Sequence, residues 1–154
     1  MHTFDIRYAS LDDIDDLAPL FDAYRVFYRQ TSDPELAHHF LLQRMNLRES
    51  VIFLARGADT GDALGFVQLY PGFSSVSAGR VWILNDLFVK PDARGRGIGR
   101  ALMQRARTHA ETTGVLRLTL STAEDNRTAQ QLYESEGWQR DGDRYYQLPI
   151  SRPS

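Results

Sequence analysis

An apolar run that leads directly into a glycine-rich turn and then a helix constrains this 154-residue chain most strongly. The stretch covers residues 83–107, and its apolar residues up to Val89 are interrupted only by Asn85 and Asp86. Such a run, stopping at Pro91, is typical of a buried strand. Beyond the turn, apolar residues recur at helical spacing between arginines. We therefore expect a strand, a turn and a helix in that order.

Three alternating glycines, Gly95, Gly97 and Gly99, form the turn. Because glycine has no Cβ, neighbouring backbone N–H groups can point outward together and a ligand can approach them closely. The helix that follows adds about half a positive charge at its N-terminus. Whole charges come from Arg94, Arg96 and Arg100. The turn is therefore predicted to bind a phosphate or pyrophosphate.

Two familiar phosphate-binding motifs do not fit this turn. The Rossmann fingerprint requires a third glycine three positions after the second, and counted from Gly97 that position holds Arg100. The P-loop requires Gly-Lys-Ser/Thr, which is absent. The pattern that fits is R-x-x-G-x-G, from Arg94 to Gly99. For this hexapeptide alone, an arginine-rich surface turn that caps a helix is the alternative.

A second segment lies downstream of the turn. Residues 116–122 alternate between apolar and polar, which predicts a strand. Asn126, Tyr133 and the pair Gly137-Trp138 then follow at fixed spacing. With both segments present, the chain resembles the GNAT family of N-acetyltransferases over residues 81–138. The acetyl-CoA-binding core of that family is a strand, an R-x-x-G-x-G loop and a helix, followed by a second strand and a helix that ends in Tyr and a Gly-aromatic pair.

Length and composition set the remaining limits. The chain suits one domain, residues 1–154, and its net charge of −2 argues against a nucleic-acid partner. Cysteine is absent, which excludes disulfides, thiolate nucleophiles and cysteine metal sites. The pair His38-His39 lacks a second pair of ligands, so no metal is expected. Without a signal sequence or an apolar run of membrane length, we expect a cytoplasmic protein with no membrane partner.

The remaining pattern predicts the element order β α α β β β α β α β. The predicted elements outside the glycine turn and its flanks are a strand at 4–8, helices at 11–28 and 34–48, strands at 51–55 and 64–70, a loop at 71–79, a strand at 116–122, a helix ending near 136 and a strand at 144–150. This order matches the resemblance, which implies an α/β acyl-CoA N-acyltransferase fold. That fold has a mixed central sheet of about six to seven strands with helices on both faces.

Local signals mark the helix ends. Ser10 is predicted to cap the first helix, and Pro19 to kink it or split it into two pieces. Ser32, with a capping box completed by Glu35, is predicted to begin the second helix. Gly114 is predicted to end the helix that follows the glycine turn.

The resemblance implies that acetyl-CoA is the co-substrate. Its pyrophosphate would lie on the backbone amides of the glycine turn, and its pantetheine arm would run along the central strand like an added strand. The backbone of that strand would also supply the N–H that stabilises the oxyanion. The residues implied for acetyl-CoA are Leu87, Phe88, Val89, Arg94, Gly95, Arg96, Gly97, Ile98, Gly99, Arg100, Asn126 and Tyr133.

The leaving thiolate needs a proton, and Tyr133 occupies the family's general-acid position. A tyrosine with a pKa of ~10 can protonate a thiolate whose conjugate acid has a pKa of ~8.5, because the proton moves only modestly uphill. The alternative is that Tyr133 packs beside Leu132 with its hydroxyl at the surface.

The acceptor amine must lose a proton. An alkylamine with a pKa of ~10.4 is neutral in about one part in a thousand at pH 7, which costs roughly 4 kcal/mol. Related acetyltransferases carry Glu-Asp in the central strand, where this chain has Asn85-Asp86. Asp86 is therefore the candidate base, directly or through a water. Successive strand residues face opposite sides, so Asn85 and Asp86 can share a face only at a bulge. Alternatively, Asp86 accepts hydrogen bonds in a purely structural role.

The acceptor side is predicted from the first helices and the loop after the third strand. Its candidate residues are Tyr24, Tyr28, Tyr70, Phe73, Asn85 and Asp86. Aromatic rings can hold a cationic amine by cation–π contact, although such rings are as often part of the core. The expected reaction is acetylation of a primary amine of a small molecule or peptide, by direct attack in a ternary complex. The resemblance extends to the polyamine and small basic-protein acetylating branch.

Other interpretations stay open. The acceptor could be an antibiotic or a protein N-terminus. Because Asn85 replaces the glutamate of related enzymes, a non-catalytic acyl-CoA-binding sensor is a second class of function. The tyrosine-rich segment 144–150 could pair with a second copy, and a homodimer is expected.

Overall fold

The computed structural model describes residues 3–152 and forms two compact units. The first unit ends at Ser121 and contains the whole sheet and three α-helices. The second begins at Thr122 and contains one helix, α4 (Arg127–Ser135). The single domain expected from the chain's length stays a prediction.

The first unit is built on a sheet of five strands, in the order β1-β2-β3-β4-β5. The strands are β1 (Phe4–Tyr8), β2 (Val51–Gly57), β3 (Ala63–Ser74), β4 (Gly79–Val89) and β5 (Leu118–Thr119). The pairs from β1 to β4 are antiparallel, whereas β4 and β5 are parallel. The α/β class and the mixed sheet are thus confirmed, with five strands in the described residues instead of about six to seven.

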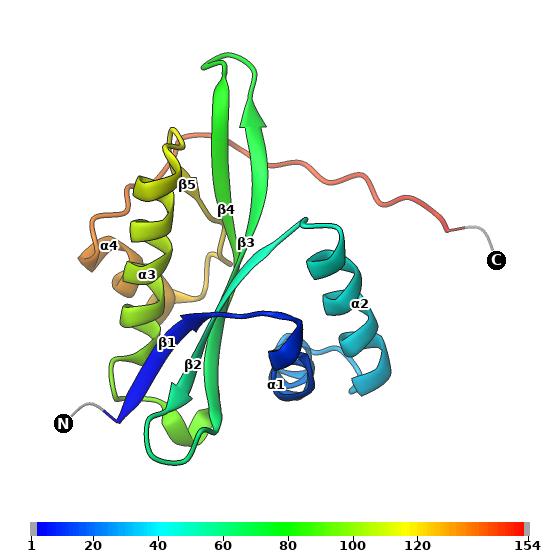
Figure 1. Cartoon of the computed structure of the whole chain (residues 1–154). Coiled ribbons are helices and arrows are strands. Elements are labelled where there is room, and N and C mark those ends of the chain that lie inside the picture. Colours follow the sequence, from blue (N-terminus) through cyan, green and yellow to red (C-terminus); the bar gives the residue numbers. More distant parts are fainter. Residues whose placement is uncertain (1–2, 153–154) are drawn as a thin grey trace. The chain divides into compact units, whose positions relative to one another are not determined.

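Helices cover both faces of this sheet, as predicted. α1 (Ile14–Phe27) and α2 (Pro34–Asn46) lie on one face and α3 (Ile98–Thr113) on the other (Figure 1). The apolar residues that recur at helical spacing are the buried ones, for example Leu17 in α1, Leu41 in α2 and Leu102 in α3, each fully buried. The sheet therefore positions β4 between two packed helical layers.

The first helical segment keeps its predicted cap but not its predicted break. Ser10 and Asp13 form a capping box, which heads the short 3₁₀ helix η1 (Leu11–Asp13) in front of α1. α1 then continues through Pro19 as one helix, so a split into two pieces is wrong. Proline removes a single helical N–H, while the neighbouring Leu20 and Phe21 are buried in the core. Packing of this face outweighs the lost hydrogen bond.

The predicted cap of α2 was one residue out. Asp33 is the N-cap, because its Oδ1 accepts a hydrogen bond from the Leu36 N–H at 3.2 Å. The Ser32 hydroxyl instead donates to Asp22 Oδ2 at 2.7 Å, and the Asp33 N–H donates to Asp22 Oδ1 at 2.8 Å. A buried carboxylate on α1 therefore decides which of two adjacent capping residues begins α2.

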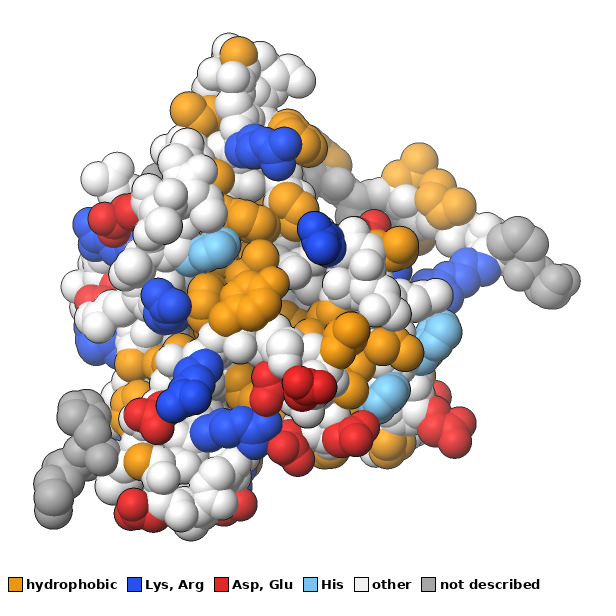
Figure 2. Space-filling model, viewed as in Figure 1, with side chains coloured by type: hydrophobic (Ala, Val, Ile, Leu, Met, Phe, Trp, Pro, Cys, Tyr) orange, Lys and Arg blue, Asp and Glu red, His pale blue; other side chains and the backbone are white. Residues whose placement is uncertain are grey.

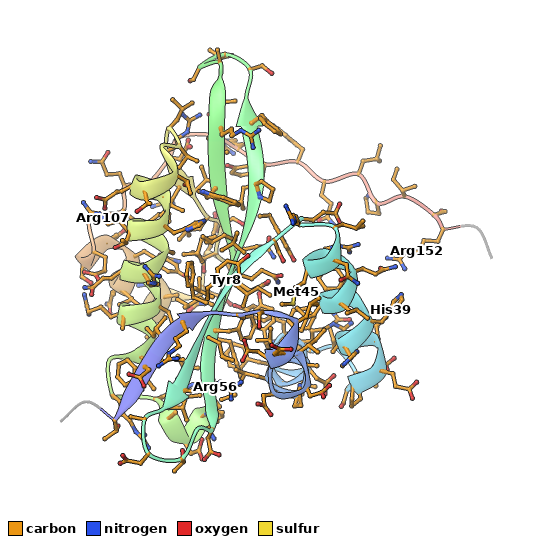
Figure 3. All side chains as sticks on the ribbon, in the orientation of Figure 1. Tyr8, His39, Met45, Arg56, Arg107 and Arg152 are labelled. Carbon is orange, nitrogen blue, oxygen red and sulfur yellow. The ribbon has the colours of Figure 1, made fainter. Side chains whose placement is uncertain are left out.

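Arg56 ties the end of β2 to the start of α1. Arg56 is labelled in Figure 3, and its guanidinium lies 2.9 Å from Asp13 Oδ1 and 3.0 Å from Asp16 Oδ2. Two acidic residues near the first turn are thus engaged in structural ion pairs. Acidic and basic side chains are mixed on the face shown in Figure 2.

Three other predicted segments differ from the structure. Residues 71–74, expected in a loop, continue β3, and the strand expected at 116–122 is reduced to β5. The strand expected at 144–150 is wrong, because residues 139–152 have no regular secondary structure. A strand needs a neighbour to satisfy its backbone groups, and the structure pairs no strand with this segment in the described residues. Its large apolar side chains are exposed: Tyr145, Tyr146, Leu148 and Ile150.

Candidate active site

A β-bulge in the middle of β4 brings two polar residues together. Gln68 on β3 pairs with Asp86, and the next residue, Leu69, pairs with Leu84, so Asn85 is the extra residue. The Asn85 Nδ2 donates to Asp86 Oδ1 at 3.0 Å. The bulge that the sequence required for these two side chains to lie together is therefore present.

Asp86 is a buried carboxylate surrounded by hydrogen-bond donors. It is 3% exposed. Gln68 Nε2 donates to its Oδ2, and the Tyr24 hydroxyl of α1 donates to the same carboxylate. Burial raises the pKa of Asp86 above its usual range, and the hydrogen bonds from Tyr24, Gln68 and Asn85 oppose that rise without cancelling it. The carboxylate therefore takes up a proton more readily than an exposed aspartate.

Tyr24, which interacts with this carboxylate, packs against other aromatic rings. The Tyr24 ring lies 5.7 Å from that of Phe66 and 5.9 Å from that of Phe88. Burial, followed by the charge of Asp86, raises the pKa of both Tyr24 and Tyr70. Both tyrosines thus keep their protons at neutral pH. Asp86 can therefore accept a proton here, while the neighbouring tyrosines keep theirs.

The glycine turn has an open, electropositive backbone. Gly95 and Gly97 both have φ of +81°, a left-handed conformation that favours glycine, and nothing lies within 4 Å of where their Cβ atoms would be. Gly97 is the N-cap of α3, and the first turn of that helix has no acidic residue. The first helical hydrogen bond runs from the Ala101 N–H to the Gly97 carbonyl at 3.0 Å. The N–H groups of Ile98 and Gly99, in the first turn, therefore precede this bond and can donate to a phosphate.

Gly99 is the informative glycine of this turn. Its φ is not in the left-handed region, and a Cβ there would meet only Val89 Cγ2 at 3.8 Å, an ordinary contact. The protein's own packing does not demand glycine at this position. A ligand that approaches the backbone closely would require glycine here. The turn therefore fits the pyrophosphate of acetyl-CoA.

Arg94, which was expected to contribute positive charge for a phosphate, makes structural contacts within the protein. Its Nε donates to the Val89 carbonyl at 2.8 Å, and its guanidinium lies over the rings of Phe27 and Phe88, 5.5 and 5.7 Å from their centroids. Arg96 Nη2 contacts the Asp92 carbonyl at 3.5 Å. Arg94 thus attaches the glycine turn to the end of β4, which fixes where the turn begins.

The outer edge of β4 is open beyond the bulge. β5 pairs only with Trp82 and Ile83, so within the described residues 84–89 have no strand partner on that side. Leu87 and Val89 are half-buried, whereas Phe88 is buried in the core. An extended pantetheine arm can therefore pair with the backbone here, while the Phe88 side chain serves packing.

The second unit contains the other two predicted residues. Asn126 is the N-cap of α4, where its Oδ1 accepts a hydrogen bond from the Ala129 N–H at 3.3 Å. The Tyr133 ring lies 6.1 Å from that of Trp138. The predicted roles of Asn126 toward pantetheine and of Tyr133 as acid stay predictions.

The predicted acceptor residues are only partly gathered. Three of them interact with Asp86: Tyr24, Tyr70 and Asn85. The ring centroid of the half-exposed Tyr28 lies 5.0 Å from that of Tyr24. Phe73 is 72% exposed and lies five residues along β3 from Gln68. At about 3.3 Å per residue this is roughly 16 Å away, near the turn of the hairpin, where Arg80 stacks over its ring.

Gln68 was missed by the sequence prediction. Its only signal is that it is polar within the apolar run 64–70. No cluster of three or more His, Cys, Asp or Glu that could hold a metal occurs in residues 3–152. None of the helices in that range is long and apolar enough to cross a membrane.

The fold is that of the acyl-CoA N-acyltransferases, and comparison with known families agrees. The family model described as "Acetyltransferase (GNAT) family" matches residues 15–138. The chain belongs to this family, which uses acetyl-CoA, and it is an N-acetyltransferase.

Particular relatives support this assignment. The chain is 48% identical over 136 residues to the uncharacterized N-acetyltransferase YhfO of Bacillus subtilis, covering 88% of this chain and 90% of that protein. It is 29% identical over 126 residues to the D-amino-acid N-acetyltransferase HPA3 of Saccharomyces cerevisiae, covering 79% and 76%. A crystal structure of a probable acetyltransferase superposes with a TM-score of 0.91 at 45% identity, covering 97% and 99%.

Proposed function

We propose that the protein transfers an acetyl group from acetyl-CoA to a primary amine of a small molecule or peptide, by direct attack in a ternary complex. The observation that carries this proposal is the buried Asp86. It lies at a bulge of β4, on the strand whose outer edge is open and whose end leads into the glycine turn. A proton acceptor, a site for an extended ligand and a phosphate site thus follow one another along a single stretch of chain.

Asp86 acts as the base for the acceptor amine. A carboxylate offers about four lone-pair positions, of which Tyr24, Gln68 and Asn85 occupy three. The remaining position accepts the amine proton through a water, because the carboxylate is almost completely buried. The raised pKa of Asp86 lies closer to the pKa of the acceptor ammonium, so moving the proton from the amine to Asp86 costs less free energy.

The glycine turn and β4 hold the cofactor. The N–H groups of Ile98 and Gly99 at the start of α3 donate to the pyrophosphate, with the side chains of Arg94, Arg96 and Arg100 nearby in the sequence. The pantetheine arm lies along Leu87, Phe88 and Val89, and a backbone N–H of this edge stabilises the oxyanion. When bound, acetyl-CoA supplies the activated acetyl group.

The transfer is a direct displacement at the thioester. The amine nitrogen forms the new C–N bond, the C–S bond breaks, and the thiolate takes a proton from the Tyr133 hydroxyl. Because the chain has no cysteine, no thiol of the protein can carry the acetyl group. Both substrates are therefore bound together, and Asn126 contributes to pantetheine binding.

The acceptor faces the aromatic group next to Asp86. Tyr24, Tyr28 and Tyr70 suit a cationic amine, because the π-faces attract it before it loses its proton. The yeast relative whose name specifies D-amino acids shows one kind of amine used by similar proteins. A free amino acid, a polyamine or a peptide amine meets these requirements, as does an aminoglycoside or a protein N-terminus.

A non-catalytic acyl-CoA sensor is the second candidate. The observation that favours it is Asn85, whose amide donates to Asp86 and cannot act as a base. In a sensor, the cofactor would bind and no acetyl group would be transferred. The two functions differ in a single measurable product.

We propose in addition that the protein is a homodimer. Residues 144–150 contain four exposed large apolar side chains in a segment without regular secondary structure. Backbone pairing with a second copy would satisfy this segment and bury those side chains. Sedimentation of the full chain tests the assembly: a monomeric mass at micromolar concentration would contradict it.

Thiol release from acetyl-CoA tests the enzymatic proposal. The protein is incubated with polyamines, amino acids, aminoglycosides and short peptides, and acetylated products are identified by mass. We expect release above hydrolysis with at least one acceptor class, and loss of that release in Tyr133→Phe with cofactor affinity unchanged. Binding of acetyl-CoA without any acetylated product across the panel would favour the sensor.

A further inference from the structure

Gln68 is the most completely enclosed polar side chain next to the site. It is 0% exposed and lies directly opposite Asp86 in the β3–β4 register, at the bulge. Its Nε2 donates to Asp86 Oδ2, while its Oε1 is buried and has no hydrogen-bond partner. A buried acceptor without a partner is costly and calls for an explanation.

We propose that Gln68 is a positioning residue that serves both protonation states of Asp86, donating to the carboxylate through Nε2 and accepting from the protonated carboxyl group through Oε1. This inference rests on the proposed role of Asp86 as base. It explains why an amide, with one donor group and one acceptor, stands where an apolar residue would pack at lower cost.

The proton transfer requires such a partner. When the acceptor ammonium gives up its proton, that proton bonds to an Asp86 oxygen and the carboxylate becomes a neutral carboxyl group. The new O–H needs an acceptor, and two of the present neighbours, Gln68 Nε2 and Asn85 Nδ2, can only donate. Rotation of the Gln68 amide about its terminal torsion, which is soft, exchanges Nε2 for Oε1. The protonated state is then satisfied without exposing the site.

Other groups that face Asp86 have fixed protonation. Tyr24 and Tyr70 are held protonated by burial and by the charge of Asp86. Tyr28 acts on Tyr24 from the C-terminal end of α1, and Arg44 of α2 acts on Tyr70. Tyr24 and Tyr70 keep their protons while Asp86 titrates, and the buried Gln68 Oε1 is the acceptor that still lacks a partner.

Carbon-13 titration of the Asp86 carboxyl group tests the proposal on the protein alone. The signal is assigned by its loss in Asp86→Asn. In Gln68→Met, which keeps length but removes donor and acceptor, we expect the midpoint to rise by about one pH unit, because the hydrogen bond lost from the charged carboxylate is stronger than the one lost from the neutral carboxyl group. In the wild type, the Gln68 side-chain NH₂ signals should shift with the same midpoint as Asp86. Ser50→Ala, which removes another buried hydroxyl without a partner, should leave the midpoint unchanged.

Activity gives an independent readout. The acid limb of kcat/KM should move upward in Gln68→Met by the same amount as the carboxyl midpoint. An unchanged midpoint with reduced activity would show a packing role and overturn the proposal. If Gln68→Met does not fold, the isosteric Gln68→Glu replaces it, and its higher titration step should lie above the wild-type midpoint. If no amine is acetylated while the midpoint still moves, the proposed function fails but the pairing of Gln68 with Asp86 stands.

Discussion

The glycine turn and the Asp86 cluster (Asp86 with Tyr24, Gln68 and Asn85) differ in whether their polar groups have partners within the protein. Asp86 lies only three residues before the end of β4, which leads into the turn. At the start of α3, backbone N–H groups are left without intrahelical partners, next to glycines that open onto empty space. Around Asp86, the protein supplies three donors to one carboxylate and excludes solvent. The turn leaves donors available for a ligand, whereas the cluster surrounds its carboxylate with donors from the protein and leaves only Gln68 Oε1 without a partner.

Helix α2 shows that the open start of α3 is not a general feature of this chain. There Asp33 accepts a hydrogen bond from the Leu36 N–H, and Glu35 adds a negative charge to the first turn. A cap with a carboxylate suits a helix that needs stability alone. At α3 the same carboxylate would occupy the position of a phosphate.

The largest expected effect is at the buried cluster. Asp86→Asn should lower kcat at pH 7 by roughly 10²- to 10⁴-fold, because the amide cannot accept the amine proton. The dissociation constant of acetyl-CoA should stay within about twofold, measured by calorimetry, because the glycine turn is untouched. A variant with wild-type kcat would remove Asp86 from the mechanism.

The opposite result is expected at the glycine turn. Gly97→Asp should weaken acetyl-CoA binding by roughly 100-fold, because a carboxylate at the start of α3 repels the pyrophosphate and takes up its donors. Gly61→Asp is a matched control, since Gly61 also has positive φ (+75°) with open space around it and lies in the turn between β2 and β3. Equal losses in the two variants would mean that backbone strain, not phosphate binding, caused the effect.

Gly99→Ala makes a finer separation between ligand binding and packing. A Cβ there makes only an ordinary contact with Val89, so the free energy of unfolding should change by less than about 0.5 kcal/mol. Affinity for acetyl-CoA should fall by about tenfold, because the methyl group obstructs the backbone donors. Thermal unfolding and calorimetry on the same samples measure the two quantities. Loss of stability without loss of affinity would reverse our interpretation of Gly99.

The smallest expected effect is the pH dependence of stability due to Asp86. Its folded-state pKa is raised above the ordinary value of 3.8, so the folded protein binds the proton more tightly than the unfolded chain. The stabilisation is complete below the ordinary value and is lost as the pH rises through the folded-state pKa. Relative to Asp86→Asn, the wild type should therefore gain unfolding free energy as the pH falls, by about 1.4 kcal/mol for each pH unit that separates the folded-state pKa from the unfolded-state pKa. Denaturant titrations at several pH values measure this, and parallel curves would contradict the raised pKa.

The contrast between turn and cluster also marks what the sequence could predict. The strand, the glycine turn and the start of α3 were predictable because their signals are local: Pro91, then Gly95 and Gly97 in left-handed conformations. The role of Gln68 was not, because it depends on the register between β3 and β4 and on a partner 18 residues away. The bulge at Asn85 also depends on the register between β3 and β4. From the sequence we could say only that Asn85 and Asp86 share a face if a bulge is present.

Two wrong predictions have a similar origin. Ser32 and Asp33 are both good capping residues, and the buried Asp22, distant in sequence, selects Asp33 by binding Ser32. The strand expected at 144–150 has the right residue types but no strand to pair with in the described chain. The local sequence pattern thus shows which residues could form a helix cap or a strand. Contacts with residues distant in the sequence decide whether they do.

Backbone amide NMR with acetyl-CoA is the decisive experiment for the glycine turn as the phosphate site. On titration, the largest shifts should occur in the N–H groups from Gly95 to Gly99, which precede the first intrahelical hydrogen bond of α3, and smaller shifts along Leu87 to Val89. The N–H groups at the start of α2 should not respond. Saturable binding that leaves the glycine turn unchanged would contradict the assignment of the turn as the phosphate site.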